Sequence, residues 1–334
     1  MFNWNKKEKP FASLTGFGGG IGGLSLISGL SEKPYFGDIG LIGGGADESQ
    51  SNLASLLQIT QWVSIPTTGS AYTGGNLTAD RSSGAGCSNG SRALYGGGKQ
   101  ANGVWANRGT KVKSIDYQTI STKGTCSDFG DITTNTAEFA ACSNGTRGVF
   151  GGGENPSTTE VIEYVVIDTL GTADDFGDLH TARYAQAGLS NGTRGIFAAG
   201  SGSSGYLDSI EYITIATNGD GNDLCDLNYT AYSLTGCGNR ERSIITMGRN
   251  SGGNYYNYIS YFDPTSTATA QDFGNLTVSR GWGCALNNET RAVFMGGKDS
   301  NDDAKYIDYI TIASTGDATN FHDLDKDTRD SQGA

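Results

Sequence analysis

Short apolar segments alternate with glycine-containing turns along most of the chain. In "IEYITI", which starts at Ile210, apolar and polar residues alternate imperfectly, as expected of a strand buried on both faces between neighbouring sheets. In "DFGDL", which starts at Asp175, Phe176 and Leu179 are placed to pack inward from a short outer strand or turn. The pattern predicts an all-β protein built from short strands.

These segments repeat with a period of about 48 residues. The clearest marker is an arginine inside text such as "CSNGTRGVFGGG", which starts at Cys142. The marker arginines are Arg92, Arg147, Arg194, Arg242 and Arg291. A weaker sixth copy surrounds "LIGGG" at Leu41. Short strands repeated with this period predict a β-propeller with six blades.

Each unit is expected to open with a hairpin. In the fourth unit, residues 182–190 form the predicted first strand and "TRGIFAAG" the second. Asn191 and Gly192 lie between them and predict a type I′ turn, in which both central residues have positive φ. The glycines that end the second strand are expected to let strands crowd near the axis.

The order of these features resembles the kelch repeat. An arginine opens three units, at Arg81, Arg183 and Arg280, whereas Thr136 and Ala231 stand at this place in two others. Phenylalanine stands where kelch units usually have tryptophan, at Phe129, Phe176, Phe273 and Phe321. The predicted fold class is therefore all-β, a six-bladed kelch-like β-propeller preceded by a glycine-rich N-terminal arm.

The domain organisation follows from where the repeats start and end. Residues 1–33 form the predicted arm and residues 34–334 the predicted propeller. A closed ring needs its first and last blades joined, and the first unit lacks an obvious inner strand. We expect the tail at 325–334 to supply that strand, with Arg329 at the place of the arginine that opens other units.

Charge and composition exclude several classes of partner. The net charge of −12 predicts a surface that repels nucleic acid and anionic membranes. The chain has no apolar run of the length that spans a membrane, so membrane insertion is not expected either. The six cysteines contain no C-x-x-C pair and are expected to be separate, buried thiols.

Catalytic chemistry has few candidates in this sequence. The two histidines, His180 and His322, both lie beside the closing segment of a unit and do not predict a triad or a metal cluster. We therefore expect no catalytic residue, no metal and no cofactor, and a protein that is not an enzyme. Calcium remains open at the acidic loops 219–226 and 298–308, although solvated turns are the alternative because neither has the spacing of a calcium loop.

One insertion breaks the repeat and concentrates basic and aromatic residues. The loop after Gly98 carries the candidate contact residues Lys99, Trp105, Arg108, Lys111 and Lys113. Tryptophan and arginine are typical of contact hot spots on propeller loops, which predicts a partner or glycan contact. An elongated hairpin with a solvated, charged tip is the equal alternative.

The five marker arginines are interpreted as structural. A ligand-binding arginine is normally single, because one asymmetric site requires it, whereas five equivalents around a ring indicate a shared role. Each is expected to bond carbonyls, or a carboxylate, of its own or the next blade.

A second resemblance concerns function. The text "IDYITIASTGDATNFHDL", from Ile307, together with the opening "MFNWNKKEKPFASLTGFGGG", resembles kelch-like proteins of marine bacteriophage virions. It implies a tail, fibre or capsid surface component, made in the cytoplasm of the bacterial host and located on the virion surface. The arm at 1–33 would dock on other virion proteins through the predicted anchoring residues Phe2, Trp4, Phe11, Leu14 and Phe17.

Three functions remain open on the sequence alone. The first is a non-enzymatic virion protein whose propeller is displayed for host adhesion through a surface glycan. The second is a capsid decoration protein without a receptor role. The third is a sugar-active enzyme of the kelch type, which the small number of histidines disfavours.

Overall fold

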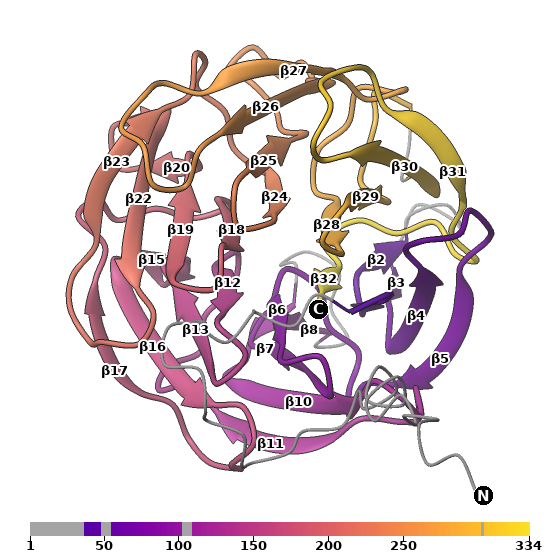
Figure 1. The fold of residues 1–334 in the computed structure, drawn as a ribbon. Coiled ribbons are helices and arrows are strands. Elements are labelled where there is room, and N and C mark those ends of the chain that lie inside the picture. Colours follow the sequence, from indigo (N-terminus) through magenta and orange to yellow (C-terminus); the bar gives the residue numbers. More distant parts are fainter. Residues whose placement is uncertain (1–36, 48–54, 102–108, 302–303) are drawn as a thin grey trace, which may run out of the picture. The chain divides into compact units, whose positions relative to one another are not determined.

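The chain forms a ring of antiparallel sheets around a central axis. The structure, a computed structural model, describes residues 37–47, 55–101, 109–301 and 304–334. In these residues six four-stranded sheets follow one another around the ring (Figure 1). The protein is therefore all-β and a six-bladed β-propeller, as its repeats predict.

Blades 1 to 3 are numbered in chain order, and their strands are given from the axis outward. Blade 1 consists of β32 (Gln332–Gly333), β1 (Ile39–Gly43), β4 (Ile59–Ser64) and β5 (Tyr72–Asn76). Blade 2 consists of β6 (Ala85–Ser88), β7 (Arg92–Gly96), β10 (Ser114–Thr119) and β11 (Ser127–Asp131). Blade 3 consists of β12 (Ala140–Ser143), β13 (Arg147–Gly151), β16 (Val161–Val166) and β17 (Asp174–Asp178).

Blades 4 to 6 repeat this order, with the "DFGDL"-type segments on the rim in Figure 1. Blade 4 consists of β18 (Ala187–Ser190), β19 (Arg194–Ala198), β22 (Ser209–Thr214) and β23 (Asn222–Asp226). Blade 5 consists of β24 (Thr235–Gly238), β25 (Ser243–Thr246), β26 (Tyr258–Phe262) and β27 (Gln271–Asn275). Blade 6 consists of β28 (Cys284–Asn287), β29 (Arg291–Met295), β30 (Tyr306–Thr311) and β31 (Thr319–Asp323).

Small hairpins distinguish one face of the propeller from the other. They join the second and third strands of blades 1 to 4. The four hairpins are β2 (Ala46–Asp47) with β3 (Ser55–Leu56), β8 (Lys99–Gln100) with β9 (Thr110–Lys111), β14 (Glu154–Asn155) with β15 (Ser157–Thr158), and β20 (Ser201–Gly202) with β21 (Gly205–Tyr206). Lys99 bridges to Ser82, just before the inner strand β6, so the hairpins mark the face where inner strands begin. We call this the hairpin face. The opposite face is the turn face.

The C-terminus supplies the innermost strand of blade 1. β32 pairs with β1, with Gly333 opposite Ile42, and the backbones of Leu41 and Ala334 exchange hydrogen bonds of 3.1 and 2.9 Å. This pairing joins the two ends of the described chain and leaves blade 1 with the same four strands as the other blades.

The position of Arg329 differs from the sequence expectation by one residue. The carbonyl of Arg81 accepts a hydrogen bond from Gly45 of the preceding blade, and the carbonyl of Thr328 accepts the matching bond from Gly297. Thr328 therefore stands at the place of the opening arginine. Arg329 instead bridges to Ala46, as Ser82 bridges to Lys99 in the next blade. The weak similarity of the tail to the other units hid this one-residue offset.

The inner hairpins turn by a mechanism that the sequence analysis did not predict. Gly192 has a φ of +87°, but Asn191 is not among the residues with positive φ, so the turn is not of type I′. The side-chain oxygen of Asn191 instead accepts hydrogen bonds from the backbone of Thr193 and Arg194, at 3.0 and 2.7 Å. Asparagine therefore acts here through its side chain, as in an Asx turn.

The predicted first strand at 182–190 is shorter in the structure because Ala185 interrupts it with a φ of +52°. This residue belongs to a closed ring of backbone hydrogen bonds, in which the N–H of each member donates to the carbonyl of its equivalent in the preceding blade, at 2.7 to 3.1 Å. The members, which we call the mouth ring, are Ser83, Glu138, Ala185, Ser233, Trp282 and Asp330. All six have φ between +52° and +59°, so the ring imposes left-handed backbone on the hairpin-face mouth.

Hydrophobic packing runs from blade to blade. Phe197 of blade 4 is fully buried, and its ring lies 2.8 Å from where a Cβ on Gly151 of blade 3 would be. Burying a phenylalanine contributes about 1.5–3 kcal/mol. The glycines that end second strands therefore make room for the aromatic residue of the next blade, which holds neighbouring sheets together.

The marker arginines also connect neighbouring blades. Nη1 of Arg92 donates to the carbonyl of Ile167 in blade 3 at 2.7 Å, and its guanidinium carbon lies 4.5 Å from the ring centroid of Tyr117. The other four make the same kind of carbonyl contact to the following blade, through Arg147 to Ile215, Arg194 to Pro264, Arg242 to Ile312 and Arg291 to Ile65. Each contact combines a charge-assisted hydrogen bond with a cation–π contact.

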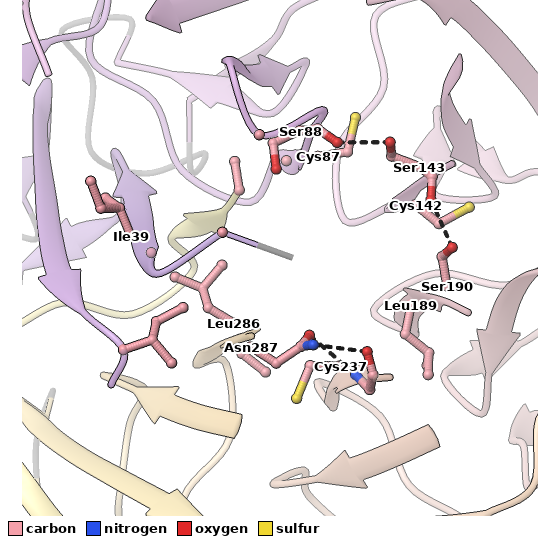
Figure 2. A pocket seen from close by; sticks show the side chains of 18 of the residues that line it. Ile39, Cys87, Ser88, Cys142, Ser143, Leu189, Ser190, Cys237, Leu286 and Asn287 are labelled. Carbon is pink, nitrogen blue, oxygen red and sulfur yellow. Dashed lines mark hydrogen bonds between the residues drawn. The ribbon is translucent and has the colours of Figure 1, made fainter. Parts of the chain in front are cut away.

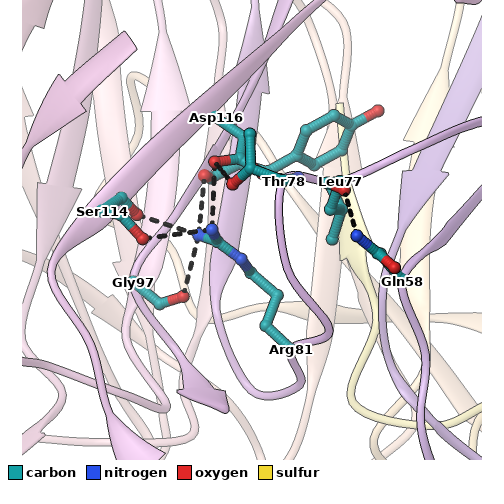
Figure 3. Close-up of polar contacts among 8 residues, drawn as sticks. Gln58, Leu77, Thr78, Arg81, Gly97, Ser114 and Asp116 are labelled. Carbon is teal, nitrogen blue, oxygen red and sulfur yellow. Dashed lines mark hydrogen bonds and ion pairs between the residues drawn. The ribbon is translucent and has the colours of Figure 1, made fainter. Parts of the chain in front are cut away.

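Blades 2, 4 and 6 share a buried ion pair. Figure 3 shows the first, in which Arg81 Nη2 lies 3.0 Å from Asp116 and both side chains are fully buried. Asp116 also accepts hydrogen bonds of 2.7 Å from the backbone and the hydroxyl of Thr78, at the end of blade 1. Arg183 pairs with Glu211 in blade 4, and Arg280 with Asp308 in blade 6. These acids hold both their own arginine and the preceding blade.

Blades 1, 3 and 5 have no arginine at this place. In blade 3 Thr136 replaces it, and Glu163, at the position of Asp116, accepts hydrogen bonds from the backbone and hydroxyl of Thr133. Burial raises the pKa of Glu163 above its ordinary value, partly opposed by these hydrogen bonds. In blade 1 the same position is Gln61, whose amide oxygen accepts from the backbone N–H of Asp325 at 2.9 Å. The ring therefore alternates between ion-paired and unpaired blades.

Candidate binding site

The axial channel opens on the turn face into a cavity of about 310 Å³. Inner-strand residues line it, among them Cys87, Cys142 and Cys237 (Figure 2). The hydroxyls of Ser143 and Ser190 each donate to a backbone carbonyl of the preceding blade at 2.7 Å. The polar groups at this end are thus largely engaged in joining the inner strands.

The thiols in this cavity are not poised for nucleophilic chemistry. Burial raises the pKa of Cys87 to about 12 and raises the pKa of Cys142 and Cys237 further. These thiols are protonated at neutral pH. All six cysteines of the chain are free and buried, as the sequence predicts.

The channel also opens on the hairpin face, inside the mouth ring. A cavity of about 160 Å³ lies there, lined among others by Gln186, Ser233, Trp282 and Gln332. In the described part of the chain, Gln186 Oε1, Ser233 Oγ and both amide atoms of Gln332 are buried without a hydrogen-bond partner. Buried polar atoms normally have a partner, so these atoms are placed to bind water or a ligand at this mouth.

The lysines of the predicted contact loop lie on this face, and each has an acidic partner. Lys99 and Lys111 stand opposite each other in the β8–β9 hairpin. Lys99 pairs with Glu138 of the mouth ring, and Lys111 lies 2.9 Å from Glu154 of blade 3. Lys113 lies 3.1 Å from Asp131 of its own blade, with half of its side chain exposed. Their charges are therefore largely matched by carboxylates.

Several predicted contact and anchoring residues lie outside the described residues. Trp105 and Arg108 of the loop belong to 102–108, and the whole predicted arm belongs to 1–36. The predicted anchoring positions Phe2, Trp4, Phe11, Leu14 and Phe17 are within that arm.

Aromatic side chains gather at the same mouth on the opposite side of the ring. Tyr206 of the blade 4 hairpin stacks on Tyr232, with ring centroids 4.4 Å apart. Trp282 stands edge-on to Tyr232 at 5.7 Å and to Tyr255 of blade 5 at 5.9 Å. All four side chains are partly exposed. We call these four residues the aromatic sector.

Arg249 lies within the aromatic sector. Its guanidinium carbon is 5.5 Å from the centroid of Tyr255 and 5.8 Å from that of Trp282. Nε donates to the carbonyl of Gly253 at 2.9 Å, and Nη1 donates to the phenol of Tyr232 at 3.4 Å. The hydrogen bond with Tyr232 raises the pKa of Arg249, so this side chain stays charged. None of its contacts within the described residues is with a carboxylate.

The local electrostatics differ from the overall charge of the protein. Burial raises the pKa of Tyr255, whereas the nearby cations Arg249, Lys298 and Arg329 act to lower it. Three cations therefore lie near the aromatic sector of a protein whose net charge is −12, and one of them, Arg329, also lies 3.6 Å from Asp330.

Sequence reasoning missed the aromatic sector, although it left a signal. The members come from separate units and gather only when the ring closes. Trp282 occupies a repeat position that is otherwise serine, alanine or an acid, and Tyr255 follows the irregular text "RNSGGN" from Arg249. A search for residues that break the repeat would have found them, as it found the loop at Lys99.

Neither the acidic loops nor the histidines form a metal centre in the described residues. No group of three or more His, Cys, Asp or Glu side chains there is placed to hold an ion. Asp220 accepts a hydrogen bond from the backbone of Asp178, and Asp299 from that of Asn301. Nor does this part of the chain contain a helix of the length and apolarity that crosses a membrane.

Comparison with known proteins adds no family to this description. No protein-family model matches the chain, and no curated protein sequence matches it.

Proposed function

We propose that this protein is a non-enzymatic binding propeller that presents its hairpin face to a glycan on a host surface. The observation that carries the proposal is the convergence of Tyr206, Tyr232, Tyr255 and Trp282 around Arg249, beside a mouth with unpartnered polar atoms. Partly exposed aromatic rings with a polar edge are typical of binding hot spots. The C–H faces of sugar rings pack on such side chains.

The biological setting is also proposed. The resemblance of the repeat text and of the N-terminus to kelch-like proteins of marine bacteriophage virions supports a role as a structural component of the virion surface. Residues 1–33 would dock on other virion proteins and leave the propeller displayed. A capsid decoration protein without a receptor role is the competing outcome.

Binding of the full-length protein to an array of bacterial surface polysaccharides tests the adhesive role. The expected result is retention on some polysaccharides, lost in a variant that combines Tyr206→Ala, Tyr232→Ala and Trp282→Ala. Tyr258→Ala is the matched control, because Tyr258 is an exposed aromatic residue of blade 5 that packs with Tyr229 and Tyr256. Failure of the wild-type protein to bind any polysaccharide would favour the decoration role.

Incorporation into particles tests the virion setting separately. A phage carrying the chain without residues 1–33 should assemble particles that lack this protein. Normal incorporation of the shortened chain would contradict the proposed anchoring role of the arm.

A further inference from the structure

The repeat places a cation at one equivalent position in three blades, and two of these cations, Lys99 and Arg249, lie across the ring from each other. The third is Lys298 of blade 6, which bridges to Gly281. Lys99 in blade 2 and Arg249 in blade 5 both follow the end of the second strand, and both bridge to the residue just before the mouth ring, Ser82 and Tyr232 respectively. The mouth-ring residue of the next blade then faces each cation. It is Glu138 beside Lys99 and Trp282 beside Arg249. One cation therefore meets a carboxylate, and the other meets an indole ring.

The hydrogen bonds of Arg249 leave part of its guanidinium available. They use Nε and Nη1, toward Gly253 and Tyr232, and within the described residues none uses Nη2. The two hydrogen bonds orient the plane of the group, and Nη2 lies beside Gly253, where a Cβ would be 3.0 Å away. A fixed, partly exposed guanidinium is suited to donate hydrogen bonds to a planar carboxylate.

Trp282 is held in place at a conformational cost. Its φ of +59° lies in the left-handed region, which is unfavourable for an L-residue by about 1–2 kcal/mol. The mouth ring enforces this backbone through the bonds of Trp282 to Ser233 and Asp330, at 3.1 and 2.8 Å. All six mouth-ring residues share this backbone, so it is a structural feature of the repeat, and at Trp282 it fixes where the indole ring is presented.

The cavity beside Trp282 offers further polar contacts. Ser233 Oγ and the amide of Gln332 line it and have no partner among the described residues. Their side chains are more than nine-tenths buried, so solvent reaches them poorly. A ligand that covered Trp282 and carried several hydroxyls would meet these atoms at its inner edge.

We propose that the aromatic sector binds a carboxylate-bearing sugar, such as a hexuronic acid within a polysaccharide. The pyranose ring packs on Trp282, the carboxylate pairs with Arg249, and ring hydroxyls reach the polar mouth at Ser233. This inference rests on the proposed function and adds the ligand class and the residues that select it. The guanidinium of Arg249, whose described contacts include no carboxylate, favours an acidic sugar over a neutral one.

Calorimetric titration of the full-length protein tests the ligand class. The probes are tetrasaccharides of glucuronic, galacturonic and mannuronic acid, the methyl esters of the same compounds, a neutral glucose tetrasaccharide and a sulfated one. We expect at least one uronic acid to bind, with its methyl ester and the neutral sugar weaker by about tenfold or more, a difference of about 1.4 kcal/mol.

Variants test the residues. Arg249→Met and Trp282→Ala should each lower the affinity for the uronic acid by about tenfold. Arg249→Lys should keep only part of the wild-type affinity, since an ammonium lacks the planar fork of a guanidinium. Lys111→Met is the matched control on the same face, because it removes a cation that already pairs with Glu154. It should bind as the wild type does. Unchanged melting temperatures would show that the variants fold.

Three results would overturn the inference. The first is that no uronic acid binds. The second is that the methyl ester, the neutral sugar or the sulfated sugar binds as tightly as the uronic acid or more tightly. The third is wild-type affinity in both Arg249→Met and Trp282→Ala. If these results appear while the protein still binds the polysaccharide array, the ligand class is wrong and the adhesive function stands. If the protein binds nothing on the array, the proposed function fails with it.

Discussion

Lys99 and Arg249 occupy the same repeat position in blades 2 and 5, and their surroundings differ in one decisive residue. Glu138 closes the contact around Lys99, whereas Trp282, its equivalent in the mouth ring, leaves Arg249 beside aromatic rings. The same backbone thus supports a structural ion pair on one side of the mouth and an open cation on the other.

The difference shows that charge counted along a sequence is not charge available to a ligand. The loop at Lys99 is the more basic stretch, yet its described lysines are matched by Glu138, Glu154 and Asp131. Paired cations should support the fold, and the open cation should support binding. Substitutions of paired and open cations should separate these two roles.

The largest expected effect comes from breaking a fully paired cation. Arg183→Leu leaves Glu211 buried without its partner and should lower the free energy of unfolding by about 3–5 kcal/mol. Chemical denaturation measures it. Thr136→Val is the control at the same repeat position in blade 3, where no ion pair exists, and should cost about 1 kcal/mol through the hydroxyl that bonds Thr134. Equal losses would contradict the structural role of the pair.

Exchanging the decisive residue should convert the open site into the closed one. Trp282→Glu places a carboxylate beside Arg249, as Glu138 stands beside Lys99, and removes the ring surface. Affinity for the sugar ligand should fall by about thirtyfold to a hundredfold, or about 2–3 kcal/mol. Ser83→Glu, which adds the same charge to the mouth ring near blade 2, is the control and should bind as the wild type. A matching loss in both variants would point to general repulsion.

Lys99→Met tests the opposite side of the mouth. It leaves the mostly buried Glu138 without its cation, so unfolding free energy should fall by about 1–3 kcal/mol while sugar affinity is unchanged. Lys113→Met removes a half-exposed lysine from its pair with Asp131 and should cost about 0–1 kcal/mol. A clear loss of sugar affinity in Lys99→Met would contradict the purely structural role of Lys99.

The smallest effect concerns an acid without a cation, Glu163. Burial raises its pKa, so the folded protein holds the proton more tightly than the unfolded chain. The ionised Glu163 therefore destabilises the folded protein. This loss of stability is absent below the pKa of the unfolded chain, about 4.3, and is complete above the raised pKa of the folded protein. Glu163→Gln copies Gln61 of blade 1. Its melting temperature should therefore rise relative to that of the wild type as pH rises, by on the order of a degree.

Melting curves across pH measure this gain, with the exposed Glu289→Gln as the control. A difference between Glu163→Gln and the wild type that shrinks as pH rises would contradict the sign of the pKa shift.

The sequence predicted the ring because repeats report local structure. Five units carry their own turn asparagine and marker arginine, and the weaker sixth keeps the glycine run at Leu41, so the period identifies six blades. Finer details depend on exact contacts. Arg329 lies one residue beyond the expected place, and Asn191 turns the chain with its side chain rather than through positive φ.

The candidate site was harder to predict because it exists only between blades. Lys99 and Glu138 belong to different units, so no local pattern shows that they pair. Tyr206, Tyr232 and Trp282 are likewise brought together by the curvature of the ring. What sequence provides is the list of residues that break the repeat, and the structure shows which of them face one another.

The most direct test of the open-cation account is a crystal structure of the full-length protein with a bound uronic acid tetrasaccharide. The account predicts the sugar carboxylate within hydrogen-bond distance of the Arg249 guanidinium and a pyranose ring against Trp282. A ligand seated instead at the Lys99–Lys111 hairpin, or in the turn-face cavity beside Cys87, would contradict it.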